Sequence, residues 1–211
     1  MKETDWKISI ARWIIEDGNY PDFKKGAVVE FALDFGNQDL VLSETNTPSC
    51  EEVIGDEGVY QVNAPILHWR QGESGEWVID VGILAYNTDI PPANATVGSF
   101  VTGQTSLGVC CYDYREYRYK SIQKPMIYRW QIERIREQWP KVSLAQLGGK
   151  AFWRKDNWDM VDVETTDAFD PRHDKLGYIV SWLMDCRLVV PEARMPHFRE
   201  TQESWIAKKS V

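Results

Sequence analysis

The sequence predicts an all-β, mainly antiparallel fold: a β-sandwich or barrel-like sheets with one or two short helices. Through most of the 211 residues, apolar and polar side chains alternate with a period of two rather than 3.6. Short apolar stretches are separated by turn-forming Gly, Pro, Asn and Asp. Apolar residues make up 43% of the chain and aromatic residues 12%, which supplies a core and excludes a disordered chain.

The first 60 residues predict a hairpin with a long loop. Residues 7–15 and 27–35 alternate as half-buried strands, and the turn-forming residues 18–22 lie between them. Residues 36–58 contain many polar and turn-forming side chains. We expect a surface excursion there, with one short strand at residues 40–42.

The middle of the chain gives the strongest hairpin prediction. Residues 66–70 and 76–86 alternate on either side of a Gly-containing turn. Gly82 in the second arm predicts a bulge or a close backbone approach. Residues 97–113 form the next expected extended stretch, which continues through residues 112–119.

The last third predicts further strands. Residues 126–133 alternate but also fit helical spacing; we expect a strand with an irregular end before Pro140. Residues 143–147 predict one helical turn, which two glycines close. Residues 158–164 and 178–190 predict strands, and the second is long enough to be central in the sheet.

The pattern favours one compact β-rich domain over residues 1–190, followed by a C-terminal tail or docking helix over residues 191–211. In that tail Phe198, Trp205 and Ile206 have the spacing of a short amphipathic helix. A faint similarity between the segments that begin at Pro21 and Ala93 raises an alternative division. The domain then consists of two related barrel-like halves, about 1–90 and 91–190.

The sequence indicates a cytoplasmic protein with no membrane span. Glu3 and Asp5 interrupt the N-terminus where a secretory signal needs an apolar stretch. No window approaches 18 uncharged apolar residues. We expect the four cysteines to be buried free thiols in a reducing compartment. These are Cys50, Cys110, Cys111 and Cys186.

Charge is distributed unevenly, and this asymmetry suggests a binding function. The formal net charge is −8, and residues 1–100 carry 17 Asp and Glu against 6 Lys and Arg. Solubility alone explains many such surfaces. The functional interpretation is an acidic surface that attracts a basic protein partner. Its candidate residues are Glu51, Glu52, Asp56 and Glu57.

A basic and aromatic segment over residues 112–141 supports an alternative function as an anion or single-stranded nucleic-acid binder. Residues 115–141 hold eight Lys and Arg against three acids, with Tyr and Trp interleaved. On a sheet the same pattern also arises from aromatic residues inside and arginines outside. The overall acidity of the chain argues against nucleic acid. The candidates are Arg115, Tyr117, Arg118, Tyr119, Arg129 and Arg134.

Catalysis is the less favoured interpretation. The chain lacks GxxxxGK[ST], GxGxxG, GxSxG, HExxH and CxxC motifs, so we predict no cofactor and no metal. The loop at residues 167–174 brings carboxylates beside a histidine, and a histidine next to an aspartate is a candidate general base. A hydrolase that uses Asp170, His173 and Asp174 is therefore a second alternative.

Ten tryptophans support the binding hypothesis. Most fall in expected strands and belong to the core. Trp153 and Trp205 lie outside the strongest strands and are candidate contact residues, because aromatic anchors dominate interface energetics. The sequence therefore favours a non-catalytic cytoplasmic protein that recognises a protein partner, such as a toxin-neutralising, immunity-like or accessory protein.

Overall fold

The protein is all-β, as the periodicity predicts. The computed structural model describes residues 5–37, 39–70, 75–147, 150–173 and 181–197, and for residues 140–158 the backbone path alone. The described helical segments are α1 (Arg12–Glu16), a π-helical turn η1 (Tyr114–Arg118) and α2 (Tyr119–Ile122). Among the described residues, the helices are all too short to cross a membrane.

Twelve strands form one highly bent sheet. In chain order they are β1 (Asp5–Ala11), β2 (Val28–Phe31), β3 (Leu33–Phe35), β4 (Val41–Leu42), β5 (Ser49–Glu52), β6 (Val59–Arg70), β7 (Glu76–Asp80), β8 (Leu84–Asn87), β9 (Phe100–Val109), β10 (Tyr128–Leu147), β11 (Lys150–Val163) and β12 (Ser181–Leu188).

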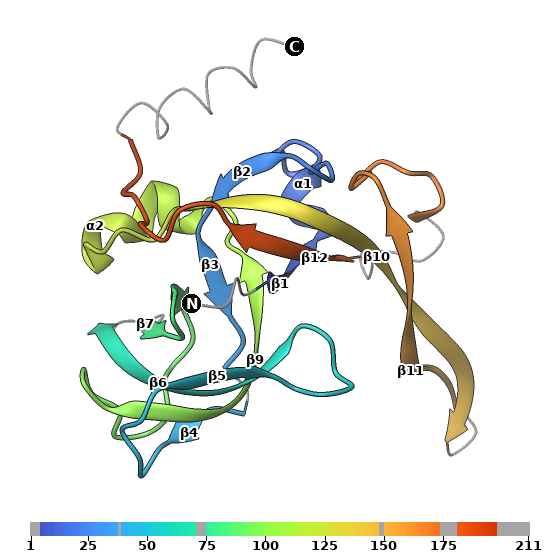
Figure 1. Ribbon diagram of the computed structural model, residues 1–211. Coiled ribbons are helices and arrows are strands. Elements are labelled where there is room, and N and C mark those ends of the chain that lie inside the picture. The colour runs from blue at the N-terminus through green and yellow to red at the C-terminus, as the bar shows by residue number, and fades with distance from the viewer. Residues whose placement is uncertain (1–4, 38, 71–74, 148–149, 174–180, 198–211) are drawn as a thin grey trace.

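Five of these strands close into a barrel-like ring in the order β9–β3–β8–β7–β6 and back to β9 (Figure 1). The β3–β8 pair is parallel and the other four pairs are antiparallel. The ring closes because β6 changes neighbours along its length. Residues 59–65 pair with β9, while the segment from Ile66 onward pairs with β7 after a register shift.

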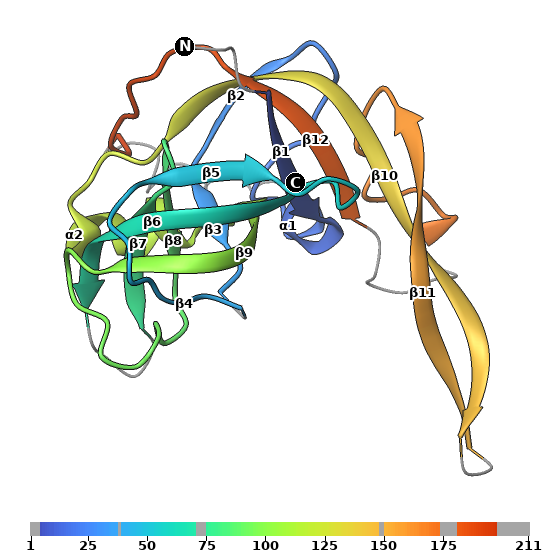
Figure 2. The same cartoon turned by 60° about the horizontal axis from the view of Figure 1, so that its bottom comes forward.

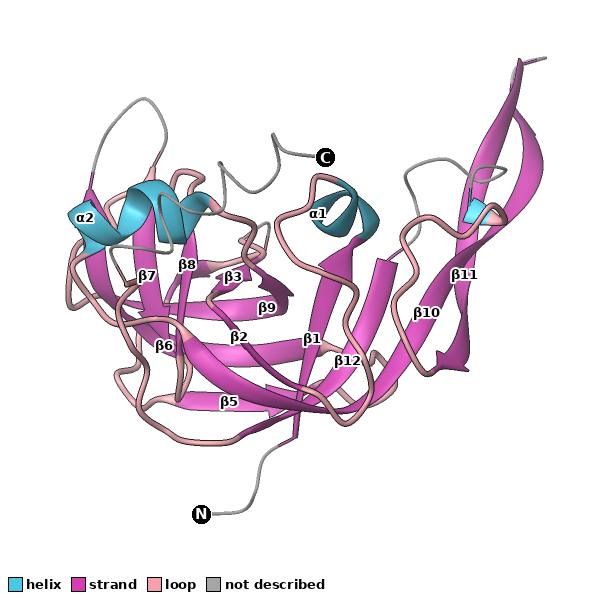
Figure 3. Ribbon diagram, turned by 90° about the horizontal axis from the view of Figure 1, so that it is seen from above, coloured by secondary structure: helices cyan, strands magenta, loops and turns pink. Residues whose placement is uncertain are grey.

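The remaining long strands extend the sheet away from the ring. β1 joins it by two parallel pairings with β9 and pairs along its whole length with β12. β12 pairs with β10, which also pairs with β2 and β11. The β10–β11 hairpin runs on beyond its neighbours as a two-stranded arm, as Figure 2 shows. Seen from above, the α2 region lies beside the ring strands β7 and β8, whereas α1 lies apart from it at the end of β1 (Figure 3).

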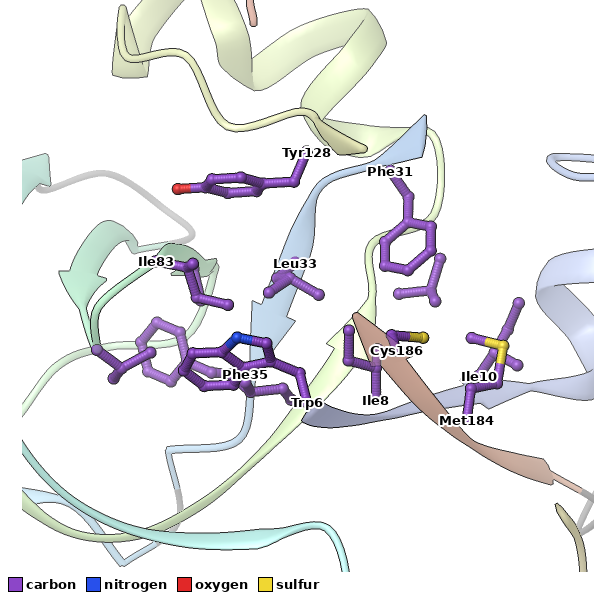
Figure 4. Packing of buried hydrophobic residues seen from close by; sticks show 14 of the residues in the cluster. Trp6, Ile8, Ile10, Phe31, Leu33, Phe35, Ile83, Tyr128, Met184 and Cys186 are labelled. Carbon is purple, nitrogen blue, oxygen red and sulfur yellow. The ribbon is translucent and has the colours of Figure 1, made fainter. Parts of the chain in front are cut away.

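Alternation places one face of most strands in a large aromatic core (Figure 4). Phe31 stacks on Trp130 with ring centroids 5.5 Å apart, and Phe35 meets Trp77 edge-on at 4.8 Å. A smaller cluster lies between the ring and the η1–α2 segment. It consists of Ala32, Val78, Tyr86, Cys110, Tyr114, Ile122, Met126 and Ile127.

The predicted N-terminal hairpin is wrong. β1 pairs with β12 and β9, whereas β2 pairs with β10. The first predicted strand also ends early, because Ile14 and Ile15 are both buried and consecutive residues of a strand face opposite sides. The helix α1 lets both side chains reach the core. The second predicted strand is divided at Ala32 into β2 and β3, which have different neighbours.

The predicted central hairpin is confirmed, with Trp69 opposite Trp77. Its second arm consists of two strands, β7 and β8, joined by a tight turn. Gly82 lies in that turn with a φ of 97°, and its N–H donates to Asp80 Oδ1 at 2.9 Å. The expected bulge at Gly82 is therefore a turn, which needs the positive φ that glycine adopts readily.

The expected extended stretch over residues 112–119 is wrong, since η1 and α2 occupy it. Tyr114 and Ile122 are buried against the outside of the ring. Tyr and charged residues alternate here in a way that fits both a strand and a short helix. A strand would turn Lys120 to the same side as Tyr114 and Ile122, but Lys120 is exposed, so the burial of this segment does not follow strand alternation.

The ambiguous segment after Pro125 is a strand, as preferred, but it continues through Pro140 to Leu147. The helical turn predicted at residues 143–147 is wrong, because these residues pair with residues 150–154. Proline is tolerated because β10 pairs with β12 only as far as Gln138. Beyond that point one edge of β10 has no neighbour among the described strands, so the missing N–H of Pro140 costs no ladder bond there.

The strands predicted at residues 40–42, 158–164 and 178–190 are confirmed in β4, β11 and the described part of β12. The predicted docking helix with Phe198, Trp205 and Ile206 lies outside the described residues. The closed ring uses strands from residues 33–109 and so draws on both of the proposed halves. The division into halves stays a prediction.

Leu33→Ala tests the central position of β3. Leu33 is fully buried at the junction of ring and outer sheet. We expect its truncation to lower the free energy of unfolding by about 2–5 kcal/mol, because buried methyl groups are lost and a cavity remains. Val28→Ala on neighbouring β2, where 45% of the residue is exposed, should cost less than about 1 kcal/mol. Urea denaturation measures both, and equal losses would contradict this packing.

Candidate functional site

The four acidic candidates come together on one hairpin. Glu51 and Glu52 end β5, and Asp56 and Glu57 lie in the turn that leads to β6. Three backbone hydrogen bonds close the turn: Val53 N–H donates to Val59 O, Asp56 N–H to Val53 O, and Val59 N–H to Asp56 O. All four acidic residues are exposed. The structure therefore gathers them on the surface that the sequence proposed.

Two of these carboxylates are neutralised within the protein. Glu52 forms an ion pair with Lys7 of β1 at 2.6 Å, and Glu57 forms one with Arg136 of β10. Glu51 and Asp56 form no hydrogen bond or ion pair through their side chains with the described residues. One pair of carboxylates therefore attaches the hairpin to the rest of the sheet, while the other pair faces solvent with its charge uncompensated.

An exposed apolar residue lies between the uncompensated acids. Ile54 at the tip of the turn has a relative exposure of 102%. Its full exposure therefore places an apolar group within an acidic surface. We call Glu51, Glu52, Ile54, Asp56 and Glu57 the β5 surface.

The candidate arginines of the basic segment are largely satisfied by the protein itself. Arg115 donates to Glu30 O at 2.6 Å and lies over the Tyr20 ring, and Arg118 pairs with Asp113 at 2.9 Å. Arg134 makes two hydrogen bonds to Asp162, at 2.6 and 2.9 Å. Such contacts leave less charge for a phosphate backbone.

The other candidates of this segment are spread over different elements. Tyr117 is 55% exposed on η1, where its ring meets Tyr112, and Tyr119 is half-buried on α2. Arg129 is exposed on β10. Trp153 belongs to β11 of the two-stranded arm, opposite Leu144. The structure does not gather these residues with Arg115, Arg118 and Arg134 into one continuous strand face, because η1 and α2 interrupt it.

The candidate histidine, His173, forms a buried pair with Glu137 rather than with the neighbouring Asp170 of its own loop. His173 is completely buried, and its Nε2 lies 2.7 Å from Glu137 Oε1, a carboxylate that is itself buried. Trp139 Nε1 donates to the other oxygen of Glu137 at 2.7 Å. The side chain of Asp170 bonds Arg172 instead, at 2.7 Å. Asp174 lies outside the described residues.

The burial of His173 argues for a structural role. Its ring packs against Trp139 and Trp182, at 5.4 and 5.8 Å between centroids. A general base must reach the proton that it abstracts, and a fully buried ring offers no such access. A buried acid–histidine pair instead fixes the local packing, because separating the pair would leave polar groups unpaired.

A cavity of about 460 Å³, which the sequence did not indicate, opens on the outer face of the ring. Leu33 and Phe35 of β3 point into the main core, so Asp34 between them points outward, into this cavity. The other lining residues come from the ends of β3 and β8 and from the connection after β9. They are Phe35, Gly36, Tyr86, Asn87, Thr88, Cys111, Tyr112 and Asp113.

Asp34 has an unusual environment for a carboxylate. The group is almost surrounded by protein, and burial raises the pKa of Asp34 to about 6. No hydrogen bond or ion pair joins it to the described residues. A Cβ on Gly108, the β9 residue paired with Asp34, would lie 2.3 Å from Asp34 Oδ1. Glycine at that position is what leaves room for the carboxylate.

The Cys111 thiol lines the same cavity, and it differs in character from the thiol of its buried neighbour Cys110. Cys110 is buried, its sulfur lies 2.8 Å from the Tyr86 hydroxyl, and burial raises the pKa of its thiol well above the usual value. Cys111 is half-exposed, and a hydrogen bond from the Cys110 thiol lowers the pKa of Cys111 to about 7. The cavity wall therefore carries, besides Asp34, a thiol whose pKa lies below its usual value.

A scan against protein-family models, a search of curated proteins and a search of solved structures each give no match to this chain. Within the described residues, no three His, Cys, Asp or Glu side chains come together as metal ligands. Function is therefore inferred from the β5 surface and the cavity themselves.

Glu137→Ala tests the role of the buried histidine pair. Removing the carboxylate leaves His173 and Trp139 without their buried partner, and we expect a loss of about 3 kcal/mol in the free energy of unfolding. Asp170→Ala, which alters the same loop at its surface, should shift the urea midpoint much less. A larger effect at Asp170 would contradict a structural role for the pair.

Asp34→Asn should make the protein more stable, with a characteristic pH dependence. The pKa of Asp34 is about 6 in the folded protein, against 3.8 for an unperturbed aspartate. Above pH 6 the ionised carboxylate opposes folding, so the neutral amide should add about 2–3 kcal/mol. Below about pH 3 the carboxyl is protonated in both states and this gain should disappear. Unfolding curves from about pH 3 to 8 measure it, and a constant difference would refute the buried charge.

Proposed function

We propose that this protein is a non-catalytic cytoplasmic binding protein that recognises a basic protein partner at the β5 surface. One observation carries the proposal: an edge strand and its turn expose uncompensated carboxylates around a fully exposed apolar residue. Glu51 and Asp56 supply the charge and Ile54 the apolar contact.

The backbone of β5 supports a specific mode of recognition. In the described part of the chain β5 pairs with β6 alone, over four residue pairs from Ser49 to Glu52. Its other edge therefore offers unpaired N–H and C=O groups, to which an extended segment of a partner can add as a further strand. Main-chain hydrogen bonds then supply affinity, and the side chains on either face supply specificity.

Charge supports a basic partner rather than a second copy of this chain. Carboxylates on an edge strand repel another acidic edge and so oppose self-association. The same carboxylates attract Lys and Arg, which raises the association rate and makes binding sensitive to salt. With a chain net charge of −8, long-range attraction acts in the same direction.

Other features fit the compartment and the role. The four cysteines are free thiols, two of them buried, as in proteins of a reducing compartment. A toxin-neutralising or accessory protein forms a one-to-one complex of the kind that one edge strand supports. Nucleic-acid binding receives less support, because Arg115, Arg118 and Arg134 already bond acceptors of this protein.

The double variant Glu51→Lys with Asp56→Lys tests the proposal. The parent protein, immobilised and exposed to extract of its source cells, should retain a basic protein in a one-to-one complex. The double variant should lose that protein, because two attractive charges become repulsive. Binding of the purified pair should weaken at least about tenfold between roughly 50 and 500 mM NaCl.

Glu192→Lys is the matched control, since Glu192 is an exposed acid after β12. It should retain the partner as the parent does. Hydrogen exchange on the purified complex should slow at the amides of β5. Retention of the same proteins by parent and double variant, or protection elsewhere than β5, would refute this function.

A further inference from the structure

The geometry of the cavity at Asp34 points to a ligand other than the partner proposed for the β5 surface. We propose that the cavity at Asp34 binds a small organic cation, with a guanidinium or alkylammonium head group against the Asp34 carboxylate. The cavity uses none of the residues of the β5 surface, so the two sites are tested independently.

The carboxylate of Asp34 lies in a position that destabilises the folded protein when the carboxylate is ionised. Asp34 lies at the centre of the ring sheet, with β8 on one side and β9 on the other. Its position requires that Gly108 carry no side chain, since a Cβ would meet Oδ1 at 2.3 Å. Ionised, unpartnered groups in such places oppose folding, and they concentrate at sites where a ligand completes them.

The walls favour a positive charge. Among the described residues, the lining includes two carboxylates, Asp34 and Asp113, and no Lys, Arg or His. Asp113 already pairs with Arg118 at 2.9 Å, which leaves Asp34 as the uncompensated charge. The Cys111 thiol, whose pKa is lowered to about 7, adds a group that is negative once it is deprotonated. A cation at Asp34 is therefore strongly attracted to the carboxylate, because water screens two opposite charges less in a recessed site than in bulk solvent.

The aromatic lining favours an organic cation over a metal ion. Tyr86 and Tyr112 line the same cavity, and aromatic faces attract ammonium and guanidinium groups. Hard metal ions need several oxygen ligands at once. The Asn87 amide has other partners, donating to Phe35 O at 2.5 Å and accepting from Asp89 N–H at 2.6 Å. A volume of about 460 Å³ suits a small molecule or one side chain.

Asp34 and Cys111 are the two lining residues whose pKa values are shifted toward neutrality. Burial raises the pKa values of Tyr20, Tyr86 and Cys110 far above neutrality, so these groups are uncharged. The pKa of Cys111 is about 7, above that of Asp34. Asp113 faces the site paired with Arg118 at 2.9 Å, and Arg118 also lies 3.5 Å from the Glu76 carboxylate. A cation that binds the Asp34 carboxylate should therefore lose affinity as the pH falls through the pKa of Asp34, about 6.

Calorimetric titration with n-butylguanidinium, against its neutral isostere n-butylurea, tests the proposal. The parent protein should bind the cation at about pH 7.5 and bind the urea at least about tenfold more weakly, since a charged hydrogen bond is lost. Affinity for the cation should fall about tenfold per pH unit below about 6, because binding then displaces one proton.

A Gly-Gly-Arg-Gly-Gly peptide that binds more tightly than n-butylguanidinium would identify a protein side chain as the source of the cation. Weaker binding of the peptide would identify a free small-molecule cation.

Asp34→Asn keeps the shape of the side chain and removes its charge, so it should weaken n-butylguanidinium binding at least about tenfold. Glu44→Gln, which neutralises an exposed acid outside the cavity, should bind like the parent. Circular dichroism checks that both variants fold. Equal binding of n-butylguanidinium and n-butylurea, or unchanged binding by Asp34→Asn, would overturn the proposal.

Discussion

The hydrogen bonding of β9 to four other strands is the constraint on which the rest of the fold depends. Residues 100–106 of β9 pair with β6, and residues 101–102 also pair with β4. Residues 107–109 pair with β3, and residues 107–108 also pair with β1. Closure of the ring and attachment of the outer sheet therefore occur on one strand. Gly103, with a φ of 146° and Asp39 O close by, lets the strand pass between these neighbours.

The same strand creates the cavity. Gly108 of β9 pairs with Asp34 and leaves space for its carboxylate, and the chain continues from β9 directly into the two cysteines and Asp113. A glycine in the middle of a sheet therefore also shapes a ligand-sized space. The β5 surface lies at the other side of the ring sheet, where β6 rather than β9 supports it. The two candidate sites thus share a scaffold but no residues.

The sequence predicted the all-β class because alternation is a local property, visible in each strand separately. It could not predict pairing, which depends on residues far apart: β1 has β12 as its neighbour, not the strand that follows it. It also misplaced η1, since alternating tyrosines and charged residues fit two structures equally. Pro140 was expected to follow the end of a strand, and only the free edge of β10 explains why the strand continues.

The candidate sites were likewise predictable only where their residues lie close together in the sequence. The acids of β5 were found because they lie close together in the sequence. His173 was assigned neighbouring aspartates, whereas its partner Glu137 comes from another strand. Asp34 has the sequence pattern of any solvent-facing residue in an alternating strand, and its burial depends on Gly108 and the connection after β9. A sequence signal for it exists only in combination with the fold.

The two-stranded arm has a consequence for how the chain tolerates change. From Trp139 onward β10 pairs only with β11 among the described strands, and no strand of the ring depends on that part of the hairpin for its register. Residues inserted at its tip would lengthen the ribbon without shifting the ring. The arm is therefore the natural place to graft a tag, a label or a second recognition segment onto this scaffold.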